Sequence, residues 1–322
     1  NLLSFYYNSV SESSTSTSIT NFDESKIAFK PKLNYEYSKG TLTAGYDYTF
    51  NNIVRDTKLG NGAFYDISKM TNSVFLNNRY DMNKLELITG YRYEKSDYEM
   101  KDQKYGTKTP SDMDKTSSNS AYSMGLNYLY SDSGKLYGKF ESGYTFPDPR
   151  QYINLTNGEG ELNNLQDEEF MTYEIGFQDY IINSLVKGAV YYTEKENEIR
   201  KEGSSLNAKF YNIDASKRIG GELSISQNIK KLELSESIAY IDAKVTEGTY
   251  EGKRIPYVSK ITSSINATYK FNEKVDLSAN VTYRDKYYVD ASNLSGLVND
   301  KFVTDIKVNY SIDSNWKTYA GI

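Results

Sequence analysis

The chain has 322 residues, a net charge of -5 and a mean hydropathy of -0.68, and it contains neither histidine nor cysteine. Ser-His-Asp triads, disulfides and thiolate metal sites are therefore excluded. The acidic clusters lack the spacing of a cation-binding loop, and no basic block suggests nucleic acid. We expect no enzyme, no cofactor, no resident metal site and no nucleic-acid partner.

Tyrosine is unusually abundant for so polar a chain, with 32 residues in an aromatic fraction of 14%. A disordered chain would be poor in aromatic residues. No apolar run approaches the ~18 residues that a membrane helix requires. Tyrosine beside many small polar residues instead suits strands with one apolar and one wet face, ending in rings at a membrane interface.

Period-two alternation recurs along the chain and predicts β-strands. It begins at residues 42–50, continues through 122–130 and 136–144, and is clearest at 261–271 and 275–283. In the last of these segments Val281 falls on the apolar face and Asn280 on the polar face. Two places are irregular, because Glu236 falls on an apolar face and residues 171–194 can be phased in two ways.

Short polar breaks alternate with long polar stretches, which predicts an antiparallel up-and-down arrangement in which all short turns lie at one end. That asymmetry is typical of an outer-membrane β-barrel with short periplasmic turns and long extracellular loops, whereas a soluble sandwich mixes turn lengths at both ends. We expect about fifteen strands, which is part of a barrel because bacterial single-chain barrels have even strand numbers. The short breaks are 38–40, 82–84, 131–134, 182–184, 228–230, 272–274 and 313–315, and the long stretches are 49–72, 94–120, 145–170, 194–209, 243–258 and 285–300.

The first ten residues, "NLLSFYYNSV", lack the charged start of a signal peptide and suggest a strand. We therefore expect the sequence to begin inside a mature protein.

Several motifs resemble, in serial order, those of TonB-dependent receptors, the outer-membrane transporters of siderophores, haem and cobalamin. "ESGYTFPDP" followed by "LNNLQDEEFMTYEIGFQ" resembles the family stretch that runs from an FrxP motif to a yElGl strand. "FYNIDASKRIGGELSIS" and "GKRIPYVSKITSSINATYKF" resemble the next two strand starts. "NSVFLNNRYDMNKLELITGYRYE" resembles an earlier strand pair, and "NWKTYAGI" resembles the penultimate strand.

The resemblance implies a 22-stranded barrel with a plug inside it. Residues 1–322 would then form the C-terminal part of the barrel domain, without the plug, the first strands and the final strand. It also implies an outer-membrane location, contact with lipid, coupling to TonB through the plug, and import of a ferric siderophore or similar chelate. Loops would capture the ligand, the plug would shift, and TonB would open a path.

Aromatic and cationic residues of the long stretches are the candidate ligand-binding residues, because they offer stacking and cation–π contacts to a bulky anionic chelate. In the 145–169 stretch we expect Arg150 to supply charge and Tyr152 a stacking face. The alternative is structural: tyrosines at the membrane interface and arginines paired with carboxylates or lipid phosphates. We read Asn212, Gly220 and Gly221 as structural too. The candidate residues are Phe146, Arg150, Tyr152, Arg200, Arg254, Tyr257, Arg284 and Tyr287.

Two other classes of protein remain open on the sequence. A passive porin or an autotransporter translocator would share the strand pattern without energy coupling. A soluble β-rich adhesin would need to bury its apolar faces between sheets.

Overall fold

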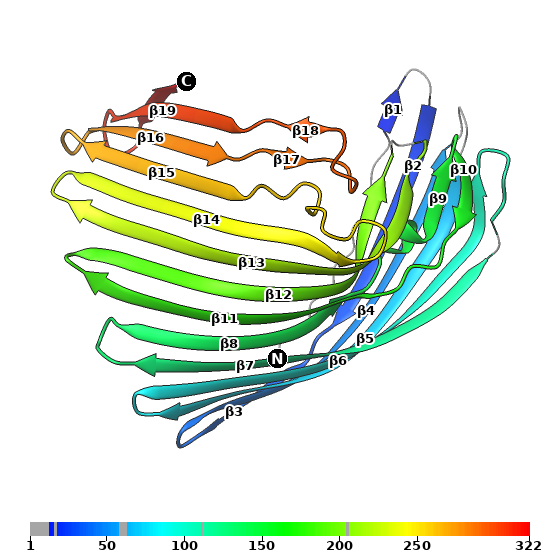
Figure 1. Ribbon diagram of the computed structural model, residues 1–322, viewed down its shortest axis with the longest axis horizontal. Helices are drawn as coiled ribbons and strands as arrows, with labels where there is room; N and C mark the ends of the chain where they lie inside the picture. Colours follow the sequence, from blue (N-terminus) through cyan, green and yellow to red (C-terminus); the bar gives the residue numbers. More distant parts are fainter. Residues whose placement is uncertain (1–12, 16–17, 58–62, 111, 204–205) are drawn as a thin grey trace.

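One antiparallel sheet, strongly curved, forms most of the molecule in the computed structural model (Figure 1). The structure describes residues 13–15, 18–57, 63–110, 112–203 and 206–322. The predicted strand at residues 1–10 lies outside this range. The main sheet runs through β1 (Ser13–Thr15), β2 (Ser18–Phe29), β4 (Gly40–Thr57), β5 (Ala63–Met82), β6 (Leu85–Tyr105), β7 (Met113–Leu129), β8 (Lys135–Thr145), β11 (Glu168–Ile181), β12 (Ser184–Glu202), β13 (Lys209–Ile229), β14 (Leu232–Glu247), β15 (Ile261–Lys270), β16 (Val275–Arg284), β19 (Lys301–Ser311) and β20 (Lys317–Gly321).

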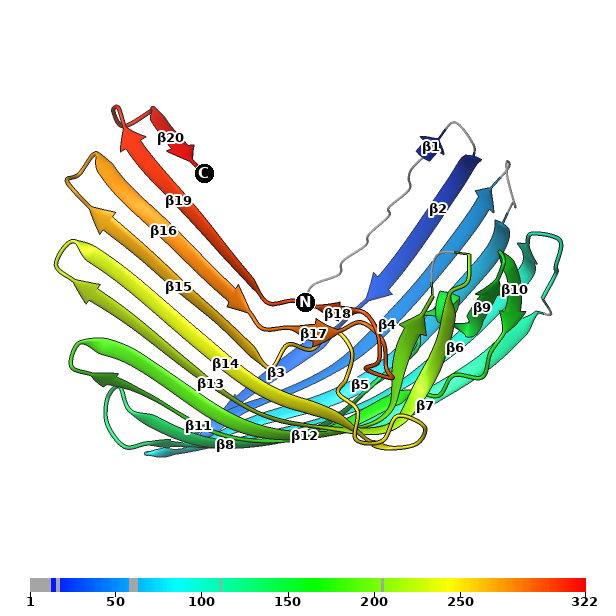
Figure 2. The same cartoon turned by 45° about the horizontal axis from the view of Figure 1, so that its top comes forward.

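β3 (Lys32–Tyr37) and β2 both pair with the same edge of β4, one after the other along it. The break between β2 and β3 includes Pro31, which cannot donate a hydrogen bond to the ladder. The sheet therefore has fifteen strand positions among the described residues. Figure 2 shows the β1–β2 edge and the β19–β20 edge facing each other across an open gap. The predicted all-β, partial barrel is confirmed.

All seven short breaks are tight turns between consecutive strands, as predicted. Two of the long stretches, 49–72 and 94–120, were wrong as loops, because strands occupy most of them: β5 has 20 residues and β6 has 21. The stretches 243–258 and 285–300 are mostly loop, as predicted. Twenty residues of strand span roughly 65 Å, far more than the ~30 Å hydrocarbon core even when tilted. The strands continue beyond the membrane, where the outward face is mostly polar, while the inner face carries the buried residues Tyr65, Ile67, Tyr98 and Met100.

The apolar residues of the alternating segments face outward, as predicted, and remain exposed on the sheet. Val281 lies opposite Ile265, which is 47% exposed. The register also fixes the phase of 171–194, because the exposed Ile175 lies opposite the exposed Val190. Glu236 lies opposite Ile265 as well, so this carboxylate does face outward.

Position 220 requires glycine, because the inner face of the sheet has no room for a side chain there. It lies opposite Tyr191, and an added Cβ would come within 2.3 Å of the tyrosine ring. A register shift between β13 and β14 lies nearby, at Ala215 and Ser216. Asn212 ties strand to loop, donating to the carbonyl oxygens of Asn197 at 2.6 Å and of Gln166 at 3.1 Å. These contacts support the structural interpretation of this motif.

Among the residues that the structure describes, no helix is long and apolar enough to cross a membrane.

Candidate binding site at the loop end of the sheet

The connection between β8 and β11 is a folded flap, not the open loop that the sequence suggested. It contains a short 3-10 helix, η1 (Pro149–Tyr152), and a small hairpin of β9 (Ile153–Thr156) and β10 (Glu159–Leu162). We call residues 146–167 the flap. Figure 1 shows β9 and β10 lying against the loop end of the curved sheet.

Asp148 caps η1 and also pairs with Arg150. Its carboxylate accepts a hydrogen bond from the backbone N–H of Arg150 at 3.0 Å, and two further bonds from the guanidinium at 2.9 and 3.2 Å. Burial alone would raise the pKa of Asp148, but the bonds from Arg150 outweigh it and the pKa lies below its ordinary value. The charge of Arg150, predicted for the ligand, is thus largely committed to Asp148.

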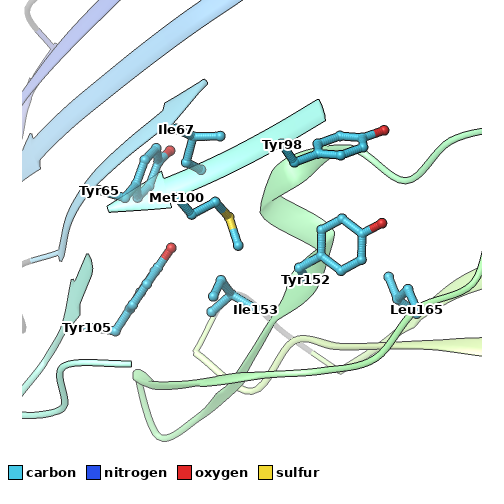
Figure 3. Close-up of a cluster of buried hydrophobic side chains, with 8 residues drawn as sticks. All are labelled: Tyr65, Ile67, Tyr98, Met100, Tyr105, Tyr152, Ile153 and Leu165. Carbon is cyan, nitrogen blue, oxygen red and sulfur yellow. The ribbon is translucent and has the colours of Figure 1, made fainter. Parts of the chain in front are cut away.

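Tyr152 anchors the flap in a buried cluster on the inner side of the sheet (Figure 3). Its side chain has no exposed surface and meets the ring of Tyr98 edge-on at 5.8 Å. The ammonium of Lys115 lies 4.5 Å from the centre of its ring. Tyr152 therefore has no ring face open to a ligand in this structure, and its contacts fix the flap.

Phe146, at the start of the flap, packs against the same cluster and is only partly buried. Its ring lies 4.9 Å from that of Tyr144, and the Lys69 ammonium lies 5.5 Å from it. Lys69 also lies 5.0 Å from the ring of Tyr98. The flap is thus held to the wall by aromatic and cation–π contacts.

Hydrogen bonds tie the far end of the flap to two neighbouring loops. The Glu159 carboxylate accepts from Thr107 N–H at 3.0 Å, from the Thr107 hydroxyl at 2.8 Å and from Lys108 N–H at 2.8 Å. On the other side, the N–H of Leu155 donates to the carbonyl oxygen of Ala208 at 2.7 Å. Sequence reasoning missed these anchors, because they depend on contacts across about 50 residues.

A hollow of about 670 Å³ opens beside the flap, and we call it the mouth pocket. Gln151 of the flap forms one wall, and the ends of β12 and β13 with the loops after β14 and β16 form the others. Its polar and aromatic lining includes Gln151, Arg200, Lys201, Glu202, Phe210, Tyr211, Tyr250, Tyr257, Asp290 and Ser292.

Of the predicted residues, the mouth pocket brings together Arg200 and Tyr257. Tyr257 is 64% exposed, and its backbone has a positive φ of 61°. Its ring lies 6.0 Å from that of Tyr287, on which the Arg284 guanidinium stacks at 4.6 Å. Tyr287 and Arg284 thus adjoin the pocket without lining it. Arg254 lies apart from this group, with its guanidinium 5.8 Å from the ring of Tyr288.

A buried ion cluster supports the pocket from below, beyond the outward apolar band. Glu198, whose side chain is 5% exposed, accepts two hydrogen bonds from Arg218 and one from Arg200. Lys195 lies 3.9 Å away and bridges to Glu168 at 3.0 Å. Burial alone would raise the pKa of Glu198, but these cations bring it below its ordinary value. The cluster fixes Arg200 at the pocket wall.

The described residues include no group of three or more acidic side chains arranged to hold a metal ion. The mouth pocket offers aromatic rings and two cations, Arg200 and Lys201, beside two carboxylates, Glu202 and Asp290.

Comparisons with known proteins identify the family. The model of the TonB dependent receptor-like β-barrel matches residues 1–322, and the chain belongs to this family of outer-membrane proteins. The predicted family and bacterial outer-membrane location are confirmed.

Three relatives illustrate the likeness. A probable TonB-dependent receptor of Bordetella pertussis, BfrD, is 23% identical over 177 residues, covering 53% of this chain and 23% of its own length. The siderophore receptor PiuA of Acinetobacter baumannii superposes with a TM-score of 0.75 and 18% identity, over 94% of this chain and 51% of PiuA. The copper transporter OprC gives a TM-score of 0.78 with 14% identity, over 94% and 50%. The chain thus spans about half of these structures.

Proposed function

We propose that this chain supplies barrel wall and ligand-binding loops to a TonB-dependent receptor that imports a ferric siderophore or similar chelate. The mouth pocket carries the proposal, because it places Arg200 and Lys201 beside Tyr211, Tyr250 and Tyr257 at the loop end of the sheet. Cations and ring faces are the groups that hold a bulky anionic chelate.

The chemistry of the pocket favours an iron chelate over copper. Copper sites in proteins use thiolate, thioether or imidazole ligands. The chain has no cysteine or histidine, and none of its methionines lines the mouth pocket. Because PiuA and OprC match this chain similarly, the fold itself does not select the ligand.

Arg200 and Lys201 make different contributions. Arg200 is paired with Glu198, which balances its charge. It can therefore offer a ligand the remaining guanidinium N–H donors and the planar face of the group. Lys201 is exposed and has no ion pair among the residues that the structure describes. We therefore assign the available positive charge to Lys201 and stacking to Tyr257, in place of Arg150 and Tyr152.

The test uses the full-length receptor and a panel of ferric chelates. Tyr257→Ala or Lys201→Ala should weaken binding of the cognate chelate by about threefold to thirtyfold, because one exposed cation–π contact is worth roughly 0.5–2 kcal/mol. Tyr180→Ala is the matched control, since Tyr180 is 61% exposed at the opposite end of the sheet. Equal affinities of all three variants and wild type would contradict this site.

Energy coupling separates the receptor from a passive pore. Chelate uptake by cells that carry the full-length receptor should stop when TonB is deleted, while binding at the cell surface persists. Undiminished uptake without TonB would instead indicate a porin-like channel.

A further inference from the structure

Gln151 lies where the flap meets the mouth pocket, and it belongs to both. It is the third residue of η1, where it completes a capping box with Asp148. In that motif the side chain of the third helical residue accepts a hydrogen bond from the backbone N–H of the N-cap residue. The Gln151 Oε1 atom accepts this bond from the Asp148 N–H at 2.7 Å. The same residue lines the pocket.

The capping bond fixes which end of the Gln151 amide is free. A carboxamide carries one acceptor oxygen and two N–H donors, and only the oxygen can meet the Asp148 N–H. The backbone of Gln151 is held as well, because its carbonyl oxygen accepts from the Asn163 amide at 2.7 Å. Its Nε2 atom forms no hydrogen bond within the described ranges of the chain. A partly buried residue at the pocket wall thus keeps two donors for a ligand.

Other polar groups of the pocket are partly occupied. The Asp290 carboxylate accepts from the Ser292 hydroxyl and from the N–H of Ser295 at 3.2 Å, so it serves its own loop. Arg200 uses part of its guanidinium in the buried ion cluster below the pocket. Gln151 therefore contributes neutral donors on the flap side that no other group of the described residues has taken.

The capping box by itself does not require an amide at position 151. Glutamate and glutamine complete the motif equally, since each offers an oxygen to the N-cap N–H. The two side chains differ in the group that is left for the pocket. Glutamate would add a third carboxylate to a lining that already contains Glu202 and Asp290, whereas glutamine adds two neutral donors. An anionic ligand is therefore accommodated by glutamine and repelled by glutamate.

We propose that Gln151 determines the charge specificity of the mouth pocket, because its two N–H donors bind an oxyanion on the periphery of an anionic chelate. A hydrogen bond to an ionised acceptor is roughly twice as strong as one between neutral groups. Anionic chelates thus gain more from this donor than uncharged or cationic ones. This role rests on the proposed function, and it adds a discrimination among ferric chelates.

Ferric chelates of different charge test this role with the purified full-length receptor. The probes are ferric citrate, which is anionic, ferrichrome, which is uncharged, and ferrioxamine B, which is cationic. Isothermal titration calorimetry measures their dissociation constants, and wild type should prefer the anionic probe. Gln151→Glu should bind ferric citrate about tenfold to hundredfold more weakly, the range for a hydrogen bond to a charged group. It should bind ferrioxamine B at least as well as wild type.

Three variants separate this role from a structural one. Gln151→Glu keeps the capping box, so amide exchange at Asp148 should stay at its wild-type rate. Gln151→Met removes both the cap and the donors, so it should speed exchange at Asp148 and also weaken ferric citrate. Gln227→Glu is the matched control, because it adds the same charge near the short turn at the other end of β13. It should bind every probe like wild type.

The order of affinities decides the outcome. An unchanged preference for ferric citrate in Gln151→Glu would overturn the charge role and leave the proposed function standing. So would a wild type that binds ferrichrome or ferrioxamine B more tightly than ferric citrate. If Gln151→Glu does not fold, undiminished binding of ferric citrate by Gln151→Met would overturn the role instead. Binding of no ferric chelate by wild type would contradict the proposed function, and this role with it.

Discussion

The guanidinium of Arg218 donates to both carboxylate oxygens of Glu198, at 2.6 and 2.7 Å, directly beneath the mouth pocket. The two residues lie on neighbouring strands, and Arg200 and Lys195 complete the cluster. A loop-end pocket is thus supported by a buried charge that three cations share.

Removing that charge should destabilise the barrel strongly. Glu198→Ala leaves the three cations without their common partner, and breaking a buried ion pair costs about 3–5 kcal/mol. The free energy of unfolding, measured by urea titration in lipid, should fall by this amount. Glu233→Ala breaks the exposed pair with Lys270, and should cost less than about 1 kcal/mol. Equal losses would show that the cluster is not buried in the assembled receptor.

The tip of the flap should loosen in acid. Hydrogen bonds from Thr107 lower the pKa of Glu159 below its ordinary value of 4.5. A lowered carboxyl pKa contributes stability that is present above about pH 4.5 and lost as the pH falls through the folded-state pKa. Amide exchange at Thr107 and Lys108, corrected for the intrinsic effect of pH, should accelerate below pH 4.5.

Glu159→Gln should show that faster exchange already at pH 7 and lose the pH dependence. Glu161→Gln is the matched control, because the Glu161 carboxylate accepts its hydrogen bond from the Lys108 ammonium and not from the two amides. Protection of the two amides that is unaffected by Glu159→Gln would contradict the anchor.

The two faces of β16 should respond differently to charge. Val281→Arg places a cation toward hydrocarbon and should cost about 2–4 kcal/mol near the bilayer midplane. Asn280 faces the lumen, where its amide donates to Asp305 at 3.3 Å, so Asn280→Arg should cost much less. Folding in lipid vesicles measures both variants, and equal stabilities would refute the assigned faces.

The ends of the sheet should lie on opposite sides of the membrane. Cysteines at Lys84 or Lys231, in short turns, should resist a membrane-impermeant maleimide in intact cells. Cysteines at Asn164 in the flap or at Lys253 should react. The reverse pattern would invert the orientation.

The sequence by itself determined the sheet and its faces. Alternation such as that of residues 275–283 specifies both strand and lipid-facing side, because a strand repeats every two residues and the two sides meet different solvents. The tight turns were equally readable. Asn83 and Lys230, for example, adopt positive φ inside polar breaks. Few backbone conformations can reverse the chain within so short a break.

Only the tertiary structure decided which loop residues form the site. Arg150, Tyr152 and Tyr257 are all cationic or aromatic residues on long polar stretches. In the structure Arg150 pairs with Asp148, Tyr152 is buried and Tyr257 lines the pocket. Above the membrane band the outward face becomes mostly polar, so the apolar alternation of lipid-facing strands no longer distinguishes strand from loop. The outcome depends on contacts across about 50 residues, such as Tyr98 with Pro147 and Thr107 with Glu159. Pairing at that separation is a property of the assembled sheet.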